Sequence, residues 1–461
     1  MIENVCALVK LKSLPDNSQD FIFGDPPYAL GSTVYIDKDG KPKYRLAKDF
    51  MSKWEMPDHS YWEEFFKVAE QKLKFGGRIL FFGIDRQLFL FQYYAVAAGF
   101  EIKQSLYWYF ISNFPKATDL SKQIDKRLGV EQQTTGVIGK AGAGLNKVKG
   151  FGKNTSKSEE VNKEWSETES NTELGKKYEG YKYSISPLKQ VLETVMVFQK
   201  RTKNKSVLDD VFAFENGDET ISPSIWAIDE GRVPTSETRD KKEVKNKSVT
   251  AYGDGLNGYD AGSHEGGRYP SQMFIDSTCA SKIDGQSGEE DASRILHHIG
   301  YLDEELDLVF YSPKVSTFER EHGCGDIEKK THRLMREGNE EADINNEVLQ
   351  RFISEPKGNN HPTLKPIKLI YQIAKLLKAP FSQRVFFPFA GARSEIIGFE
   401  QAGFNHELFS GSEISEEFNN IGAVRQVAWR ELDINNLDEN KKHIEKRSKE
   451  HKKQESLFDA N

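Results

Sequence analysis

The stretch Phe21-Ile22-Phe23-Gly24-Asp25-Pro26-Pro27-Tyr28 decides the fold. Three apolar residues followed by glycine predict a short buried strand. The two prolines must end it, because proline has no N–H to donate to a β-ladder. An acid and an aromatic residue therefore lie at the carboxyl end of a strand, which is where ligands bind in open α/β sheets.

These side chains suit an aromatic base that carries an exocyclic amine. Asp25 and the Pro26 carbonyl offer two acceptors for the two amine hydrogens, and Tyr28 offers a ring on which the base can stack. Asp-Pro-Pro is also common turn chemistry, so on this tetrapeptide alone a simple turn is an equal alternative.

Composition narrows the class of protein. The 461 residues suffice for two or three domains, and charged residues make up 29% of them. No apolar run reaches the ~18 residues of a membrane span, and the N-terminus lacks the regions of a signal peptide. The three cysteines are scattered, so we expect neither a disulfide framework nor a metal site. We therefore expect a cytoplasmic protein that makes no contact with a membrane.

The charge distribution bears on a nucleic-acid partner. The net charge is −7, whereas a chain that binds nucleic acid by overall charge would be basic. Positive charge is concentrated locally, at residues 139–157 and 181–205. Solvated loops explain both segments at least as well as a DNA-binding surface does.

Strands and helices alternate in two separate regions, which predicts a parallel α/β sheet. The predicted strands are 21–23, 78–82, 102–110, 306–311, 385–387 and 408–413, and the helices are 61–69, 88–98, 367–377, 394–402 and 416–429. Phe75-Gly76-Gly77 is expected to break the first helix before the second strand begins. Residues 112–305 are polar and glycine-rich apart from one apolar segment at 191–198, and we predict a separate, irregular module there. The expected divisions are 1–111, 112–305, 306–431 and a charged tail at 432–461.

A second candidate site follows the strand at 385–387. A turn containing Gly391 leads into a helix, and Glu413 ends the next strand. This layout is typical of nucleoside binding, because a helix N-terminus offers free N–H groups and the acid can hold both ribose hydroxyls. A plain βαβ unit without a ligand is the more frequent alternative.

Together these motifs resemble those of the β-class amino-directed DNA methyltransferases. The resemblance rests on Asp-Pro-Pro-Tyr at 25–28, His-Pro-Thr-x-Lys-Pro at 361–366 and Phe-x-Gly at 389–391. It covers roughly residues 10–430, and several shorter segments resemble phage and prophage members. It implies a Rossmann-like sheet with helices on both faces, in which the base-binding half precedes the cofactor half in a circularly permuted order. It further implies methyl transfer from S-adenosyl-L-methionine to the N6 of a flipped adenine at specific sites in double-stranded DNA, with residues 112–305 as the target-recognition region.

The resemblance assigns site residues by position. Those that match the catalytic motif are Asp25, Pro26, Pro27 and Tyr28. Those assigned to the cofactor are Phe23, His361, Thr363, Lys365, Pro388, Phe389, Gly391 and Glu413. Among these, Glu413 is the ribose-binding acid, and 361–365 close over the methionine end. Those assigned to DNA are Lys116, Lys189, Arg201, Arg268, Lys314 and Arg320.

The sequence departs from the family in the cofactor loop. Phe387 stands where the family usually has Asp, and Ala392-Arg393 replaces a small Ser-Gly pair. Both changes put bulk where the backbone should approach the cofactor closely. A DNA-binding protein with a decayed cofactor site is therefore an alternative.

Other methyltransferase activities are further alternatives. In the family, Asp at the first motif position goes mostly with adenine N6 and Ser with cytosine N4, but both amines present the same two hydrogens. Cytosine N4 thus remains open. Enzymes that modify RNA bases or protein glutamine share a related motif, but they usually carry Asn first and the cofactor half first.

The tail ends in Gln454-Glu455-Ser456-Leu457-Phe458. An apolar pair on a charged tail suggests an anchor for a groove on another protein. The pentapeptide resembles the bacterial sliding-clamp-binding motif, which predicts clamp binding through Gln454, Leu457 and Phe458. A solvated tail without a partner is the alternative.

Overall fold

The computed structural model describes residues 1–28, 33–45, 57–110, 117–131, 133–140, 164–184, 187–233, 265–275, 280, 283, 297–298, 315–329 and 357–436. The predicted strand at 306–311 lies outside these ranges. So do five residues of the predicted interfaces, Lys116, Lys314, Gln454, Leu457 and Phe458.

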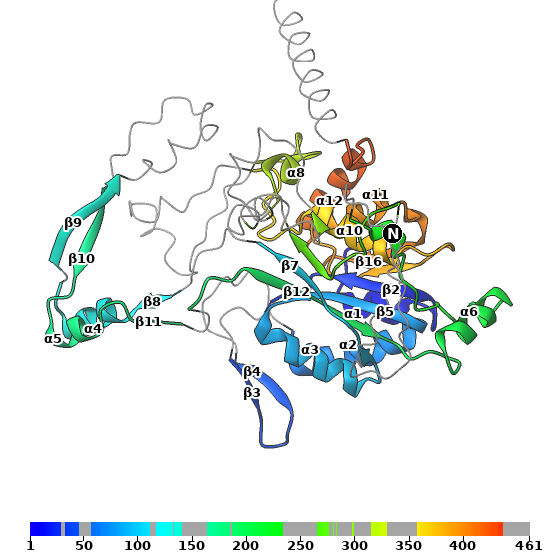
Figure 1. Ribbon diagram of the computed structural model, residues 1–461, viewed down its shortest axis with the longest axis horizontal. Coiled ribbons are helices and arrows are strands. Elements are labelled where there is room, and N and C mark those ends of the chain that lie inside the picture. Colours follow the sequence, from blue (N-terminus) through cyan, green and yellow to red (C-terminus); the bar gives the residue numbers. More distant parts are fainter. Residues whose placement is uncertain are drawn as a thin grey trace, which may run out of the picture.

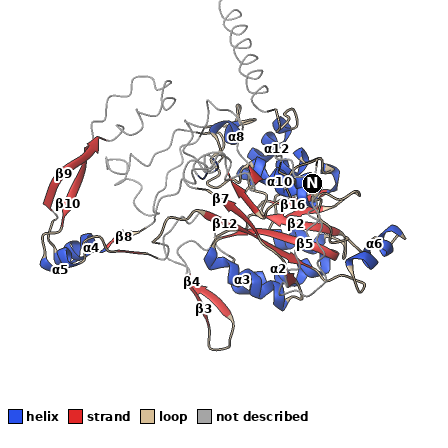
Figure 2. Ribbon diagram, in the orientation of Figure 1, coloured by secondary structure: helices blue, strands red, loops and turns tan. Residues whose placement is uncertain are grey.

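A ten-stranded sheet forms the centre of the structure (Figure 1, Figure 2). Its strands lie in the order β1-β16-β15-β2-β5-β12-β7-β13-β14, with β6 paired to β12. In that order they span Ile2–Glu3, Phe409–Ser412, Val385–Phe387, Gln19–Gly24, Leu73–Gly83, Leu192–Gln199, Leu106–Tyr109, Met273–Ile275 and His297–His298, and β6 spans Glu101–Ile102. Neighbours from β1 to β5 are parallel, whereas β12 is antiparallel to β5, β6 and β7. The predicted α/β sheet is therefore confirmed.

The predicted strand at 21–23 is β2, a central strand buried along its whole length. Ile22 belongs to the hydrophobic core on one face of the sheet, while Phe21 and Phe23 belong to the core on the other. This alternation follows from the two-residue period of a strand. Burying a large apolar side chain stabilises the fold by roughly 1.5–3 kcal/mol, so a strand buried on both faces anchors the sheet.

Helices cover both faces of the sheet. The core on one face contains residues from α1 (Ala7–Ser13), α2 (His59–Lys72) and α3 (Asp85–Ala97). The core on the other contains residues from α10 (Ile367–Leu377) and the helices α11 (Ser394–Gln401) and α12 (Glu416–Trp429). Five of these six helices were predicted, with shifts of a few residues at their ends, whereas α1 was not.

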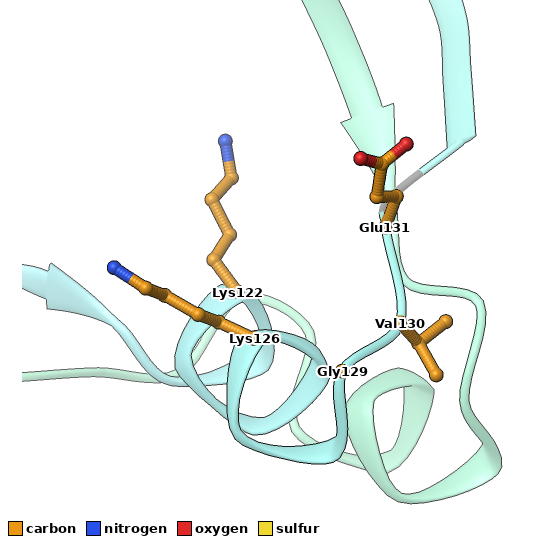
Figure 3. A pocket seen from close by; sticks show the side chains of 5 residues that line it. All are labelled: Lys122, Lys126, Gly129, Val130 and Glu131. Carbon is orange, nitrogen blue, oxygen red and sulfur yellow. The ribbon is translucent and has the colours of Figure 1, made fainter.

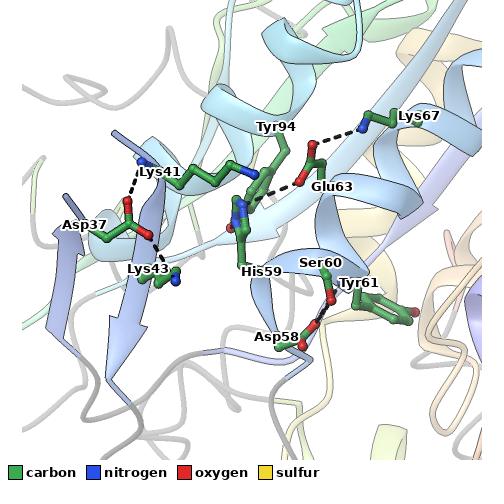
Figure 4. Close-up of polar contacts among 10 residues, drawn as sticks. All are labelled: Asp37, Lys41, Lys43, Asp58, His59, Ser60, Tyr61, Glu63, Lys67 and Tyr94. Atoms are coloured by element: carbon green, nitrogen blue, oxygen red, sulfur yellow. Dashed lines mark hydrogen bonds and ion pairs between the residues drawn. The ribbon is translucent and has the colours of Figure 1, made fainter. Parts of the chain in front are cut away.

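The start of α2 is held by polar contacts, which Figure 4 shows beside the hairpin of β3 (Thr33–Ile36) and β4 (Pro42–Arg45). Asp58 accepts hydrogen bonds from the Tyr61 N–H at 2.9 Å and the Ser60 hydroxyl at 2.7 Å. His59 Nδ1 lies 2.8 Å from the Tyr94 hydroxyl. Asp58 is thus an N-cap, which satisfies one of the free N–H groups of the first helical turn.

Two sequence-based expectations need refinement. The first helix ends before Phe75-Gly76-Gly77, at Lys72, and these three residues already lie within β5. The apolar segment at 191–198 is β12, which is inserted in the main sheet between β5 and β7. This part of the predicted separate module, together with β13, therefore belongs to the sheet. Hydrophobic periodicity indicates that a strand is buried, but it does not determine which strands it pairs with.

Residues 117–131, 133–140 and 164–184 form an arm that extends from the sheet (Figure 1, left). Its elements are β8 (Thr118–Asp119), α4 (Leu120–Leu128), β9 (Gln133–Lys140), β10 (Glu164–Glu169), α5 (Glu173–Lys177) and β11 (Lys182–Tyr183). Buried Asp125 joins its two helices by accepting hydrogen bonds from the Ser170 and Thr172 hydroxyls, both at 2.6 Å. Its surface has a hollow lined by Lys122, Lys126, Gly129, Val130 and Glu131 (Figure 3).

The remaining short helices are α6 (Val207–Glu215), α8 (Thr317–Glu321), η1 (Asp229–Gly231) and η4 (His406–Leu408). No helix in the described ranges is both long enough and apolar enough to cross a membrane.

Candidate active site

The two candidate sites of the sequence lie side by side. β2 and β15 are parallel neighbours, and the chain leaves β2 towards β5 but leaves β15 towards β16. Such a switch point is where open α/β sheets bind ligands, beyond the carboxyl ends of the strands. Asp25 follows β2, and Gly391 follows β15. The strand ends are close: a Cβ on Gly24 would lie 3.3 Å from Pro388 Cγ.

Lys365 connects the start of α10 to the Asp-Pro-Pro-Tyr motif. Its Nζ lies 2.6 Å from Asp25 Oδ2 and 3.2 Å from the Tyr28 hydroxyl. It also lies 3.2 Å from Glu193 Oε1, and the Tyr28 hydroxyl donates a hydrogen bond to that same oxygen. Sequence motifs more than 300 residues apart thus share one polar cluster, and we refer to Asp25, Tyr28, Glu193 and Lys365 as the Lys365 cluster.

Glu193 is a member of this cluster that the sequence-based assignment missed. It lies near the start of β12, where the antiparallel direction of that strand brings it to the edge at which β5 ends. Its side chain is buried. One signal for it was present in the sequence, namely a single acid at the start of the apolar run 191–198. Because burying an unpaired acid is costly, such an acid is expected to have a partner.

Burial and charge set the protonation of the cluster. Burial alone would lower the pKa of Lys365, but the carboxylates of Asp25 and Glu193 outweigh it and raise that pKa above its usual value. Burial, reinforced by the same two carboxylates, raises the pKa of Tyr28 well above 10. Lys365 is therefore an ammonium and Tyr28 a neutral phenol at physiological pH.

Glu395, in the first turn of α11, is a further titratable group of the site. Burial, together with the charge of Asp25, raises the pKa of Glu395 to about 7. Glu395 was not selected from the sequence, because glutamate is common in the first turn of a helix, where it interacts favourably with the helix dipole.

Asp25 keeps one free acceptor. Its Oδ1 is buried and has no hydrogen-bond partner among the described residues, whereas Oδ2 is held by Lys365. A carboxylate accepts hydrogen bonds on both oxygens, and an unpaired buried acceptor is unfavourable. The site can therefore accept an N–H donor from a ligand at Oδ1.

Gly391 is required by the geometry of the second constellation. Its φ is +47°, and a Cβ there would lie 2.8 Å from His361 Nε2. Its N–H donates to Glu413 Oε2 at 2.7 Å, while Glu413 Oε1 accepts from the Ser415 N–H at 2.8 Å. His361, Gly391 and Glu413, which the sequence analysis assigned to one cofactor, are thus in contact.

His361 is neutral in this position. Burial lowers its pKa to about 3, a shift opposed by a hydrogen bond with the Thr363 backbone. The imidazole packs edge-on against Phe418, with ring centroids 4.5 Å apart. Arg320, which was assigned to DNA, donates to the His361 carbonyl at 2.6 Å and so supports this loop.

The side chains of Phe387 and Arg393 point away from the turn between β15 and α11. Phe387 is buried, with its ring edge-on to Phe399 and Phe409 at 5.4 and 5.2 Å. Arg393 donates to Gln426 Oε1 at 2.8 Å and Asn419 Oδ1 at 2.6 Å, both on α12. The expectation that these side chains crowd the approach to the loop is therefore corrected.

The other residues assigned to the cofactor are packed in the structure or, in one case, exposed. Phe23 is fully buried against Phe82 and Phe399, as a core residue. Phe389 stacks on Phe65, with centroids 6.0 Å apart, and Thr363 is exposed. Pro388 is buried beside Gly24 and accepts from the Ser412 hydroxyl at 2.8 Å through its carbonyl.

Among the described residues assigned to DNA, Lys189 and Arg201 lie at opposite ends of β12. Lys189 is exposed just before β12, on the side of the site. Arg201 follows the other end of β12, roughly 25 Å along the strand, where its carbonyl accepts from the Gly76 N–H. Arg268 exchanges backbone hydrogen bonds with Val233.

No protein-family model matches the chain, and no curated protein matches it. Among solved structures, it is similar to the M1.HpyAVI–SAM complex, with 12% identity, coverage of 92% of this chain and 98% of that one, and a TM-score of 0.34. It is also similar to the PvuII DNA methyltransferase (cytosine-N4-specific), with 13% identity, coverage of 91% and 84%, and a TM-score of 0.35. Because both TM-scores are below 0.5, neither likeness determines the function.

Proposed function

We propose that this chain is an S-adenosylmethionine-dependent methyltransferase that acts on the exocyclic amine of a base in double-stranded DNA. The observation that carries the proposal is the free Oδ1 of Asp25, at the switch point that also presents Gly391 and Glu413. An acceptor for an amine and a cradle for a nucleoside thus lie beyond adjacent strands.

The residues fit the cofactor. Glu413 presents a carboxylate at the end of β16 for the ribose hydroxyls, and the glycine turn leaves no side chain between the loop and His361. His361 would flank the bound molecule. When bound, S-adenosylmethionine supplies an electrophilic methyl group on a sulfonium centre.

Asp25 would activate the amine. The lone pair of an exocyclic amine is delocalised into the ring, and hydrogen bonds from its two N–H groups to Asp25 Oδ1 and the Pro26 carbonyl favour a tetrahedral nitrogen. Positive charge then builds on that nitrogen during attack, and the adjacent carboxylate stabilises it. The amine is paired inside a duplex, so the base must be flipped out, and the Tyr28 ring provides its stacking surface.

Adenine N6 is the proposed target atom, on the family association of Asp at the first motif position. Cytosine N4 is the alternative, since both amines offer the same two donors. Target recognition is proposed for those parts of residues 112–305 that lie outside the sheet, and sliding-clamp binding for Gln454, Leu457 and Phe458. The decayed-site alternative loses its support, because Phe387 and Arg393 point away from the loop.

The test combines labelled S-adenosylmethionine with unmethylated genomic DNA, followed by nucleoside analysis of the product. The proposal expects N6-methyladenine. N4-methylcytosine would keep the reaction and overturn the choice of base. Intact DNA binding without any methyl transfer would instead favour the decayed-site alternative.

A further inference from the structure

The Lys365 cluster is a closed set of hydrogen bonds. The ammonium has three N–H donors, and it faces three oxygens, on Asp25, Tyr28 and Glu193, at 2.6, 3.2 and 3.2 Å. The Tyr28 hydroxyl accepts from Lys365 and donates to Glu193. Asp25 Oδ1, by contrast, is buried without a hydrogen-bond partner among the described residues.

From this geometry we infer that Glu193 is a positioning residue for the methyl transfer. Glu193 shares the positive charge of Lys365 and so leaves Asp25 with uncompensated negative charge at Oδ1. The inference rests on the proposed function and deepens it. Glu193 does not reach the reacting atoms itself but acts through Lys365 and Tyr28.

The second carboxylate changes the net charge of the cluster. Asp25 and Lys365 alone would form a neutral pair at 2.6 Å, and a neutral pair stabilises a growing positive charge on the amine poorly. Glu193 adds one negative charge 3.2 Å from the same ammonium. The cluster then carries a net charge of −1 towards the substrate, in a buried environment where charges are weakly screened.

The hydrogen-bond pattern gives Glu193 a second effect. Its link to the Tyr28 hydroxyl fixes the end of the ring on which the flipped base would stack. Loss of this link would let both Tyr28 and Lys365 move, and small displacements of positioning groups cost large factors in rate.

Its position on β12 makes Glu193 a stable support. Glu193 pairs with Trp108 on β7, and the next residue, Thr194, pairs with Gly83 at the end of β5. Groups placed by a strand that is bonded on both sides hold their geometry better than groups on loops.

The experiment compares wild type with Glu193→Gln and Glu193→Asp in steady-state methyl transfer to unmethylated DNA. Glu193→Gln keeps an acceptor for Tyr28 but removes the charge, so kcat should fall by about tenfold or more while the KM for S-adenosylmethionine stays within twofold. Glu193→Asp, which keeps the charge, should recover part of kcat. The matched control is Glu101→Gln, which removes a half-exposed acid paired with the other end of β12.

The split between kcat and KM, together with recovery of kcat in Glu193→Asp, separates positioning from a purely structural role, because a structural defect would weaken cofactor binding as well. An equal kcat in Glu193→Gln, with an active wild type, would overturn the inference alone. An inactive wild type would instead overturn the proposed function, and the inference with it.

Discussion

The backbone N–H of Gly391 donates a hydrogen bond to Glu413 Oε2 at 2.7 Å. This single contact joins the turn after β15 to the acid after β16, two segments that the sequence pattern could only place at equivalent strand ends. It places a carboxylate against a turn that carries no side chain at Gly391, and the proposed cofactor site depends on this arrangement.

Glu413→Gln should weaken S-adenosylmethionine binding at a small cost in stability. Hydrogen bonds to a charged group are worth ~1.5–3 kcal/mol, so the Kd should rise by roughly 10- to 100-fold. Glutamine keeps only one of the two acceptors that hold the N–H groups of Gly391 and Ser415, so one of these donors loses its partner. Burial raises the pKa of Glu413, so loss of the charge offsets part of this cost, and the melting temperature should fall only slightly.

Calorimetric titration and thermal unfolding check both parts of that prediction. Glu407→Gln is the matched control, because Glu407 is an exposed acid that precedes the same strand. An unchanged Kd in Glu413→Gln would remove Glu413 from the cofactor site.

Gly391→Ala should abolish cofactor binding and destabilise the protein by more than backbone strain alone. A left-handed conformation costs a non-glycine residue ~1–2 kcal/mol, and here the Cβ would also displace His361. Gly129→Ala isolates the strain, since Gly129 has a φ of +72° and no neighbour within 4 Å of its added Cβ. Urea denaturation should show the larger loss for Gly391→Ala, and equal losses would contradict the contact with His361.

Arg393→Ala should leave cofactor affinity within twofold of wild type while lowering stability by about 1–3 kcal/mol. The reason is that Arg393 makes two hydrogen bonds to α12, each worth ~0.5–1.5 kcal/mol. Arg430→Ala, which breaks the more exposed pair with Glu400, is the control and should cost less. A clear gain in cofactor affinity in Arg393→Ala would show that this side chain obstructs the loop after all.

Stability should depend on pH through His361. Its folded-state pKa is about 3, below the usual 6.5, so below pH 6.5 the unfolded state binds a proton that the folded state excludes. Stability is therefore lost as the pH falls from about 6.5 towards 3. His361→Gln should lose less stability over this range, as measured by urea denaturation at each pH. Parallel curves for the two proteins would contradict a buried, neutral His361.

The central sheet and its two motifs were predictable because their signals are local. Apolar runs ended by proline or glycine marked β2 and β15, and the helical period of apolar residues marked α10. The place of β12 was not predictable, because an antiparallel strand can be supplied by any later segment and its pairing is a long-range property.

Only the residues of the site that belong to sequence motifs were predictable. Asp25, Gly391 and Glu413 lie where a strand-end argument puts them, whereas Glu193 needed the pairing of β12. Side-chain direction was also out of reach: Arg393 turns to α12 because Asn419 and Gln426 offer it oxygens. Likewise, Lys365 was assigned to the cofactor, but the structure pairs it with Asp25.

The most direct test of the central claim is the effect of Asp25→Ala on methyl transfer and on cofactor binding, measured on the same preparation. Removing the carboxylate should abolish transfer to DNA, because the amine loses its acceptor at Oδ1. The Kd for S-adenosylmethionine should change little, since Gly391 and Glu413 are untouched. Wild-type turnover in Asp25→Ala would contradict the assignment of Asp25 as the group that activates the amine.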